Sequence, residues 1–210
     1  MGFYADHILP HLVRLACGST APERERRRIV PSAHGRVLEI GLGPGLNLPH
    51  YNPKAIEILF ALEPSSAMWK LAERKTKSLP FEVRPLEAPA ESIPLDDASV
   101  DSVVMTFTLC TIPNPRAALA EIRRVLRPDG QLLFAEHGRA PDEKVLKWQT
   151  RLTPMWSRLG GGCHLDRPIA GLIEESGFNL VDIEEGYAPG WKPVAYHYRG
   201  RAEPGAPAAP

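Results

Sequence analysis

The spacing of apolar positions between residues 36 and 137 changes repeatedly along the chain. Short apolar runs predict buried strands, and apolar residues three or four positions apart predict helices between them. The predicted strands in this region are Val37–Ile40, Ile56–Leu62, Phe81–Leu86, Val100–Phe107 and Gln131–Glu136. The predicted helices are Ser65–Lys77, with a serine as its N-cap, and Pro115–Leu126. Pro85 indicates that its strand lies at a sheet edge, because proline lacks the amide that a central strand needs.

The same patterns continue towards the C-terminus. We expect helices at Glu143–Leu159 and Pro168–Ser176, and further strands at Phe178–Glu184 and Trp191–Arg199. Strands that alternate with helices predict an α/β fold with a parallel sheet covered on both faces. The expected architecture is therefore a Rossmann-like, seven-stranded, mostly parallel sheet.

The chain divides into three predicted parts: a helical extension at 1–35, a domain at 36–200 and a disordered tail at 201–210 rich in proline and alanine. In the extension, Phe3–Cys17 has near-helical apolar spacing with an irregular first turn at Pro10. The arginine-rich segment Ala21–Val30 is interpreted as a solvated helix face, and the alternative is a grip on an anionic substrate or lipid headgroup.

Composition excludes several classes of partner. The 210 residues include 25 basic and 25 acidic ones, so no overall field favours nucleic acid or an anionic membrane. The three cysteines are odd in number and widely spaced, which predicts reduced thiols in a cytoplasmic protein. No apolar run is long enough to cross a bilayer, so we expect no stable membrane insertion.

A glycine-rich loop follows the first predicted strand. Gly41, Gly43 and Gly45 stand at alternate positions, which lets the backbone turn sharply beneath a ligand. A dinucleotide fingerprint would place its third glycine at position 46, where this chain has Leu46, so a dehydrogenase is disfavoured. The G-x-G-x-G pattern, preceded by Glu39, resembles motif I of class I S-adenosylmethionine-dependent methyltransferases. The resemblance implies S-adenosyl-L-methionine as cofactor, with Glu39, the three glycines and Asn47 at its site.

An acidic residue ends the second predicted strand. Glu63 stands where a carboxylate can accept hydrogen bonds from both ribose hydroxyls of an adenosine, and Pro64 and Met68 would wall the adenine. Two further blocks resemble the same family. In that family the residues at Ala90-Glu91 lie beside the adenine ring, and the block that begins at Thr106 lies beside the methionine portion. Pro89 departs from the pattern, because many members carry an aspartate there.

The second half of the chain resembles a narrower group. Glu136-His137-Gly138 and the segment Gly162 to Arg167 are similar to the C-terminal half of the methyltransferase-like seven family. The animal members of that family are alkyl-thiol S-methyltransferases, so the resemblance implies a small-molecule acceptor and favours a thiol. The animal proteins begin with a hydrophobic membrane-anchoring segment, whereas residues 1–35 resemble the soluble bacterial relatives of the family, so we do not expect membrane attachment.

His137 is the predicted catalytic residue, because an imidazole titrates near neutral pH and is able to take the proton of a thiol with a pKa of about 8.5. A histidine with only a structural role is the alternative. Trp148, Trp156 and His164 are predicted to contact the substrate. Cys110 is interpreted as a core residue, and no metal site is expected, because Cys163 and His164 have no other ligands clustered near them in sequence.

Other functions stay open. Phospholipid N-methyltransferases and quinone C-methyltransferases share the 36–137 block, and a protein that binds the cofactor without catalysis would keep the same glycines and Glu63. The sequence leaves the acceptor atom and the oligomeric state undetermined.

Overall fold

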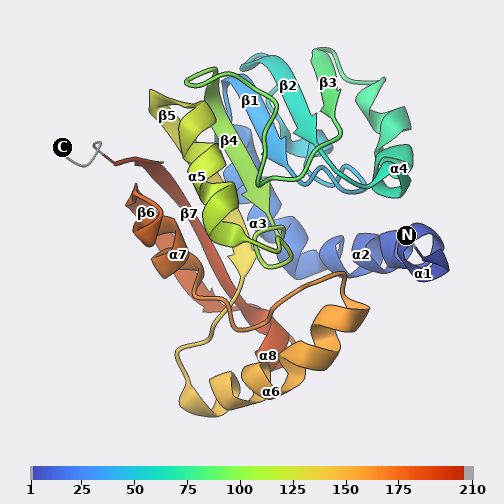
Figure 1. Cartoon of the computed structure of the whole chain (residues 1–210), viewed down its shortest axis with the longest axis vertical. Helices are drawn as coiled ribbons and strands as arrows, with labels where there is room; N and C mark the ends of the chain where they lie inside the picture. The colour runs from blue at the N-terminus through green and yellow to red at the C-terminus, as the bar shows by residue number, and fades with distance from the viewer. Residues whose placement is uncertain (1, 206–210) are drawn as a thin grey trace.

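The computed structural model describes residues 2–205, apart from the side chains of residues 5 and 6. Within this range a seven-stranded sheet has the order β3-β2-β1-β4-β5-β7-β6 (Figure 1). Its strands are β1 (Gly35–Ile40), β2 (Ile56–Leu62), β3 (Glu82–Leu86), β4 (Val100–Thr106), β5 (Leu126–His137), β6 (Phe178–Tyr187) and β7 (Tyr196–Pro204). β1 to β5 pair in parallel and β7 is antiparallel to both neighbours, which confirms the predicted fold class.

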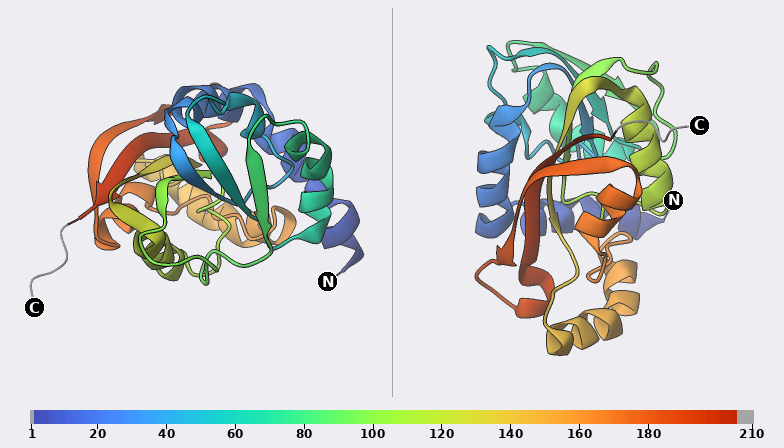
Figure 2. Two further views of the ribbon diagram at one scale, coloured as in Figure 1. Left: turned by 90° about the horizontal axis from the view of Figure 1, so that it is seen from above. Right: turned by 90° about the vertical axis from the view of Figure 1, so that its left-hand side faces the viewer.

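Helices cover both faces of the sheet, also as predicted. They are α1 (Phe3–His7), α2 (Leu9–Cys17), α3 (Thr20–Ile29), α4 (Ser66–Thr76), α5 (Pro115–Val125), α6 (Glu143–Leu159), α7 (Ile169–Glu175) and α8 (Lys192–Ala195), with short 3-10 turns η1 (Val30–Ser32) and η2 (Leu48–His50). Figure 2 shows α3 on one face and α5 with α7 on the other. In Figure 1, α2, α6 and α8 lie beyond the end of the sheet towards which β1 and β4 point.

Local sequence explains where two of these helices begin. Ser65 Oγ accepts a hydrogen bond from the Met68 amide at 3.3 Å, which is the predicted N-cap of α4. Asn114 Oδ1 does the same for the Ala117 amide at 3.1 Å at the start of α5. Both side chains satisfy amides that have no partner within the helix.

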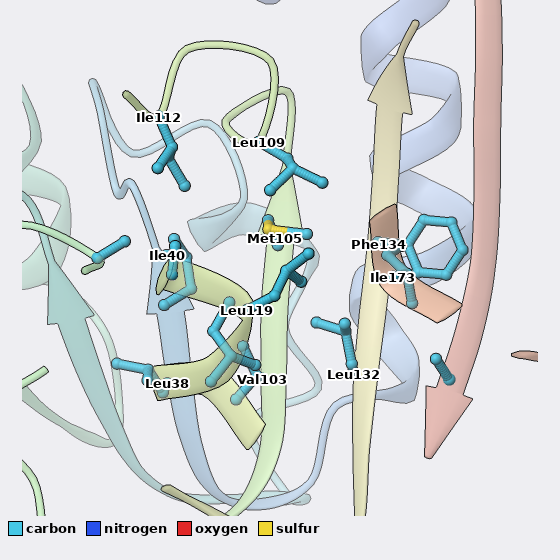
Figure 3. Close-up of a cluster of buried hydrophobic side chains, with 14 of the residues drawn as sticks. Leu38, Ile40, Val103, Met105, Leu109, Ile112, Leu119, Leu132, Phe134 and Ile173 are labelled. Carbon is cyan, nitrogen blue, oxygen red and sulfur yellow. The ribbon is translucent and has the colours of Figure 1, made fainter. Parts of the chain in front are cut away.

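The largest apolar cluster fixes β1, β4 and β5 against α5 and α7 (Figure 3). Side chains from these five elements meet there, and each is at most 1% exposed: Leu38, Ile40, Val103, Met105, Leu119, Leu132, Phe134 and Ile173. Complete burial of one such side chain contributes about 1.5–3 kcal/mol. The carboxyl ends of β1, β4 and β5 are therefore held at fixed positions.

Two sequence predictions differ from the structure. The segment Phe3–Cys17 forms two helices, because the chain breaks at Ile8, and Pro10 then occupies the first turn of α2. The strand predicted at Trp191–Arg199 starts only at Tyr196, because the short helix α8 precedes it. Pro193 lies in the first turn of α8, a position that proline favours.

The predicted disordered tail is also partly wrong. β7 continues to Pro204, where Ala202 pairs with Leu132 of β5 and Pro204 pairs with Phe178 of β6. Residues 206–210 lie outside the described range.

Two further sequence predictions can be compared directly with the structure. Pro85 lies in β3, which is one of the two edge strands, as predicted. Among the described residues, none of the helices combines the length and the apolar content that a bilayer crossing requires.

Candidate active site

A pocket of about 1390 Å³ lies at the carboxyl ends of β1, β2, β4 and β5. Parallel sheets bind ligands at this edge, near the point where strand order reverses, which here lies between β1 and β4. Most of the predicted site residues line the pocket: Glu39, Gly41, Gly43, Asn47, Glu63, Pro64, Met68, Ala90, Glu91, Thr106, His137 and Trp156.

The glycine loop has a backbone that other residues adopt only with strain. Gly41 and Gly45 have φ angles of +69° and +68°. A Cβ at Gly41 would lie 2.6 Å from Thr108 Cγ2, and one at Gly45 would lie 2.7 Å from Leu48 Cδ1. Glycine therefore lets the loop after β1 approach the loop after β4. Gly45, a predicted cofactor residue, does not line the pocket and lies against Leu48 and Ala72.

A buried network joins β1 to β4. Glu39 is 1% exposed and accepts hydrogen bonds from Asn47 Nδ2 at 3.0 Å and from the Tyr51 hydroxyl at 2.8 Å. Asn47 Oδ1 accepts a hydrogen bond from Thr106 Oγ1 at 3.1 Å. Burial raises the pKa of Glu39 to about 7, although the hydrogen bonds from Tyr51 and Asn47 oppose this. The network fixes three predicted cofactor residues relative to one another.

Glu63 is held in one orientation by backbone amides. Its Oε2 accepts from the Gly43 amide at 2.8 Å, and its Oε1 accepts from the Ser65 amide at 2.9 Å. Burial raises the pKa of Glu63, and the two amides partly offset that effect. Because each carboxylate oxygen has two lone pairs, both oxygens keep acceptor capacity towards the pocket.

Glu136 has a role that the sequence did not reveal. This residue is fully buried, and its carboxylate accepts hydrogen bonds from three successive amides, those of Thr108 at 2.8 Å, Leu109 at 3.0 Å and Cys110 at 3.4 Å. Burial raises its pKa to about 7 against these hydrogen bonds. The one sign in the sequence is an acid at the end of an otherwise apolar strand.

The loop that Glu136 holds includes a strained residue. Phe107 has a φ angle of +53°, which is uncommon for a residue with a Cβ. Its ring is 5.3 Å from the ring of His197 and 6.5 Å from that of His137. The Phe107 ring thus lies beside both histidine rings, and all three residues line the pocket.

His137 is paired with a thiol. Its Nε2 lies 3.1 Å from Cys163 Sγ, and one nitrogen or sulfur atom from each of Cys110, His137 and Cys163 lies within 4.8 Å of the others. A hydrogen bond from Cys110 lowers the pKa of Cys163 against the effect of burial, and His137 lowers it further. Burial acts to lower the pKa of His137, but the nearby Cys163 outweighs it and raises that pKa.

Arg26 corrects the interpretation of the arginine-rich segment. Arg24, Arg27 and Arg28 are exposed, as predicted, but Arg26 is only 3% exposed and lines the pocket. Its Nη1 donates to the Cys17 carbonyl at 2.5 Å, and its guanidinium lies 5.0 Å from the centre of the Phe107 ring. Within the described residues its Nε has no hydrogen-bond partner. The sequence indicated the burial of Arg26 only through its position three and four residues before the apolar Ile29 and Val30, which places the three on one helix face.

The predicted substrate residues do not all meet in the pocket. Trp156 lines it, whereas Trp148 is 56% exposed and lies outside the lining. His164 is also outside, and its amide donates to the Cys110 carbonyl at 2.9 Å. Sequence analysis missed His197, which lines the pocket with its Nδ1 unpartnered among the described residues.

Comparisons with known proteins match this chain in both sequence and fold. The family described as Methyltransferase domain matches residues 38–134. A crystal structure of an S-adenosylmethionine-dependent methyltransferase from Thermotoga maritima covers 95% of this chain and 97% of its own, with a TM-score of 0.68 and 21% identity. The fold is thus the one that class I S-adenosylmethionine-dependent methyltransferases share.

Two relatives narrow the class. Thiol S-methyltransferase TMT1B of Rattus norvegicus is 36% identical over 172 residues, which are 79% of this chain and 69% of the relative. Thiol S-methyltransferase TMT1A of Homo sapiens is 32% identical over 175 residues, 82% of this chain and 72% of the relative. The chain belongs to the methyltransferase family that contains TMT1A and TMT1B, so the predicted class and the prediction of an enzyme are confirmed. Family membership implies S-adenosylmethionine as the cofactor.

We expect Glu136→Ala to lower the free energy of unfolding by about 2–4 kcal/mol, because three buried amides lose their acceptor and a cavity remains. Urea unfolding followed by circular dichroism measures the change. Glu57→Ala is the matched control, since Glu57 is exposed on β2 and should change stability by less than about 0.5 kcal/mol. Equal stability of the Glu136 variant and the control would contradict the structural role of this carboxylate.

Proposed function

We propose that this methyltransferase transfers the sulfonium methyl group of S-adenosylmethionine to the sulfur of a small thiol. The observation that carries the proposal is the position of His137, beside Cys163 and in the same pocket as the glycine loop and Glu63. The names of the TMT1 relatives support a thiol as the acceptor.

The cofactor would occupy the side of the pocket formed by β1, β2 and the glycine loop. Glu63 would accept hydrogen bonds from the ribose hydroxyls, since its orientation is already fixed by the Gly43 and Ser65 amides. Pro64, Met68, Ala90 and Glu91 line the adjoining wall and would enclose the adenine. The network of Glu39, Asn47 and Thr106 would face the methionine portion.

Arg26 would bind the carboxylate of that methionine portion. A guanidinium that is 97% buried is costly unless it meets an anion, and its Nε is unused within the described chain. Its position over Phe107, at the end of β4, is where the family resemblance places the methionine portion.

The acceptor would enter the apolar side of the pocket, which Leu9, Leu12, Trp156 and Val194 line. His137, which is paired with Cys163, would take the proton of the acceptor thiol, so that the sulfur is a thiolate when it receives the methyl group. Bound S-adenosylmethionine would supply that methyl group as an activated electrophile and would leave as S-adenosylhomocysteine, with a methyl thioether as the other product. Positioning supplies most of the catalysis, because a thiolate is a strong nucleophile and the sulfonium an activated donor.

Turnover of methyl-labelled S-adenosylmethionine with matched panels of alkyl thiols, amines and quinols tests the proposal. We expect label in thioethers. Label transferred only to amines or quinols would contradict the proposed acceptor, and cofactor binding with no methylated acceptor would favour a protein that binds the cofactor without catalysis.

Glu63→Ala should weaken S-adenosylmethionine binding by about 1–3 kcal/mol through the loss of charge-assisted hydrogen bonds. Isothermal titration calorimetry measures the dissociation constant. Glu57→Ala, at an exposed position on the same strand β2, should leave it unchanged. Unchanged affinity in folded Glu63→Ala protein would reject the assignment to the ribose.

Arg26→Met should weaken S-adenosylmethionine binding about 10-fold, which corresponds to about 1.4 kcal/mol for one charge-assisted contact. The same variant should bind decarboxylated S-adenosylmethionine as well as the wild type does, because that ligand offers no carboxylate. Arg27→Met controls for loss of charge, as Arg27 is exposed on the same helix. Equal losses for both ligands would show that Arg26 acts only on the structure.

His137→Ala should lower thiol turnover at least about 10-fold, with the dissociation constant of S-adenosylmethionine within about twofold of wild type. Single-turnover kinetics at saturating cofactor separate these two quantities. The control His164→Ala alters the neighbouring histidine outside the pocket and should retain turnover. Wild-type turnover in His137→Ala would remove His137 from the reaction.

A further inference from the structure

Three potential metal ligands converge from distant parts of the chain. Cys110 lies in the loop after β4, His137 ends β5, and Cys163 lies in the turn after α6. One ligand atom from each lies within 4.8 Å of the other two, and His137 Nε2 is 3.1 Å from Cys163 Sγ. No metal site was predicted because no further ligand lies near Cys163 in the sequence. The fold brings Cys110 and His137 to Cys163 from distant parts of the chain.

These separations suit a tetrahedral cation. Zinc bonds of about 2.3 Å to sulfur and 2.0–2.1 Å to nitrogen place neighbouring ligand atoms of a tetrahedron about 3.5–3.8 Å apart. Shifts of no more than about 1 Å would bring the three side-chain atoms to these distances. Two thiolates and one imidazole form a soft donor set, which selects zinc over calcium or magnesium.

The backbone around the three residues is already organised. Glu136 accepts a hydrogen bond from the Cys110 amide, and the Cys110 carbonyl accepts one from the His164 amide. Gly161 and Gly162 have φ angles of +64° and +93°, which allow the tight turn that directs Cys163 towards Cys110. Outer contacts of this kind fix ligand orientation in metal sites.

The cluster faces the pocket. Cys110, His137 and Cys163 all belong to its lining, so a cation held by them would keep a fourth position towards the acceptor side. Three protein ligands with one open position are typical of catalytic rather than structural zinc.

We propose that Cys110, His137 and Cys163 bind a zinc-type divalent cation whose open position receives the sulfur of the acceptor. The two cysteine thiols release their protons to solvent when the cation binds. The acceptor thiol likewise loses its proton and stays on the cation as a thiolate until its sulfur takes the methyl group. With the cation bound, His137 acts as a ligand and the cation replaces it in activating the thiol. The metal site stands by itself, and its use for the acceptor rests on the proposed function.

Metal content and zinc titration of the purified, reduced full chain test the site. We expect about one zinc per chain in the wild type. Cys163→Ser should weaken zinc binding by more than about 100-fold, because loss of even an outer-shell partner costs about 10–100-fold. Cys17→Ser removes a thiol outside the cluster, and His164→Ala removes an imidazole outside it; both should keep wild-type stoichiometry. Retained S-adenosylmethionine binding shows that each variant is folded.

Cobalt replaces zinc as a spectroscopic probe. The wild type should show a thiolate-to-cobalt charge-transfer band and visible bands typical of four-coordinate cobalt, and Cys110→Ser and Cys163→Ser should each weaken the charge-transfer band. Added alkyl thiol should shift the visible bands if its sulfur takes the open position. Absence of stoichiometric metal in reduced wild type, or binding that survives Cys163→Ser, overturns the metal site. Visible bands that do not respond to the thiol overturn its proposed use.

Turnover with and without a chelator separates this proposal from the proposed function. Thiol methylation by protein that binds no metal supports the function and overturns the metal site. Metal binding without methylation of any thiol keeps the site and contradicts the thiol acceptor.

Discussion

The hydrogen bonds from three loop amides to the buried carboxylate of Glu136 hold the acceptor side of this pocket together. β4 ends at Thr106, and without an acceptor at the end of β5 the amides that follow would be buried and unpaired. With the loop fixed, Phe107 keeps its positive φ angle and Cys110 lies beside His137 and Cys163. Arg167 strengthens the same loop from the other side by donating to the Leu109 carbonyl.

The half of the pocket proposed for the cofactor and the half proposed for the acceptor differ in how much of their structure the sequence alone could predict. The glycine loop, Asn47, Glu63 and Met68 belong to one continuous stretch of β1, β2 and α4, so their spacing in sequence translates into spacing in space. Strand boundaries there were predicted closely, because apolar runs in a parallel sheet are buried on both faces and end abruptly. Pro85 even placed β3 at the edge.

The acceptor half depends on contacts between distant segments. Cys110 and Cys163 look unrelated in sequence, and they meet only because the segment after α6 returns to the loop after β4, where the His164 amide donates to the Cys110 carbonyl. Arg26 belongs to a run of arginines whose charge predicted exposure to solvent. Only its position in the helical period distinguishes it from the neighbouring exposed arginines. The last strand was predicted to start too early, at Trp191. The alternation of residues in the sequence does not reveal the short helix α8, which has Pro193 in its first turn. For Trp148 the helix was predicted correctly, but its contact with the substrate was not found. Whether a helical side chain faces the pocket or solvent depends on how the helix packs, and Trp148 is exposed.

The charges in the pocket explain why such a site suits a sulfonium donor. Glu39, Glu63 and Glu136 are all buried in the pocket or beneath its lining. Their carboxyl groups accept hydrogen bonds from backbone amides, Asn47 and Tyr51 and form no ion pairs among the described residues. Among the described residues, Arg26 is the buried arginine near these three carboxyl groups, and they outnumber it. A nearby positive charge favours ionisation of carboxyls whose pKa burial has raised to about 7, as for Glu39 and Glu136. S-adenosylmethionine carries this charge on its sulfur, and S-adenosylhomocysteine has lost it. If the proposed function holds, these carboxylates would attract the sulfonium of the donor, and that attraction would end when the methyl group leaves.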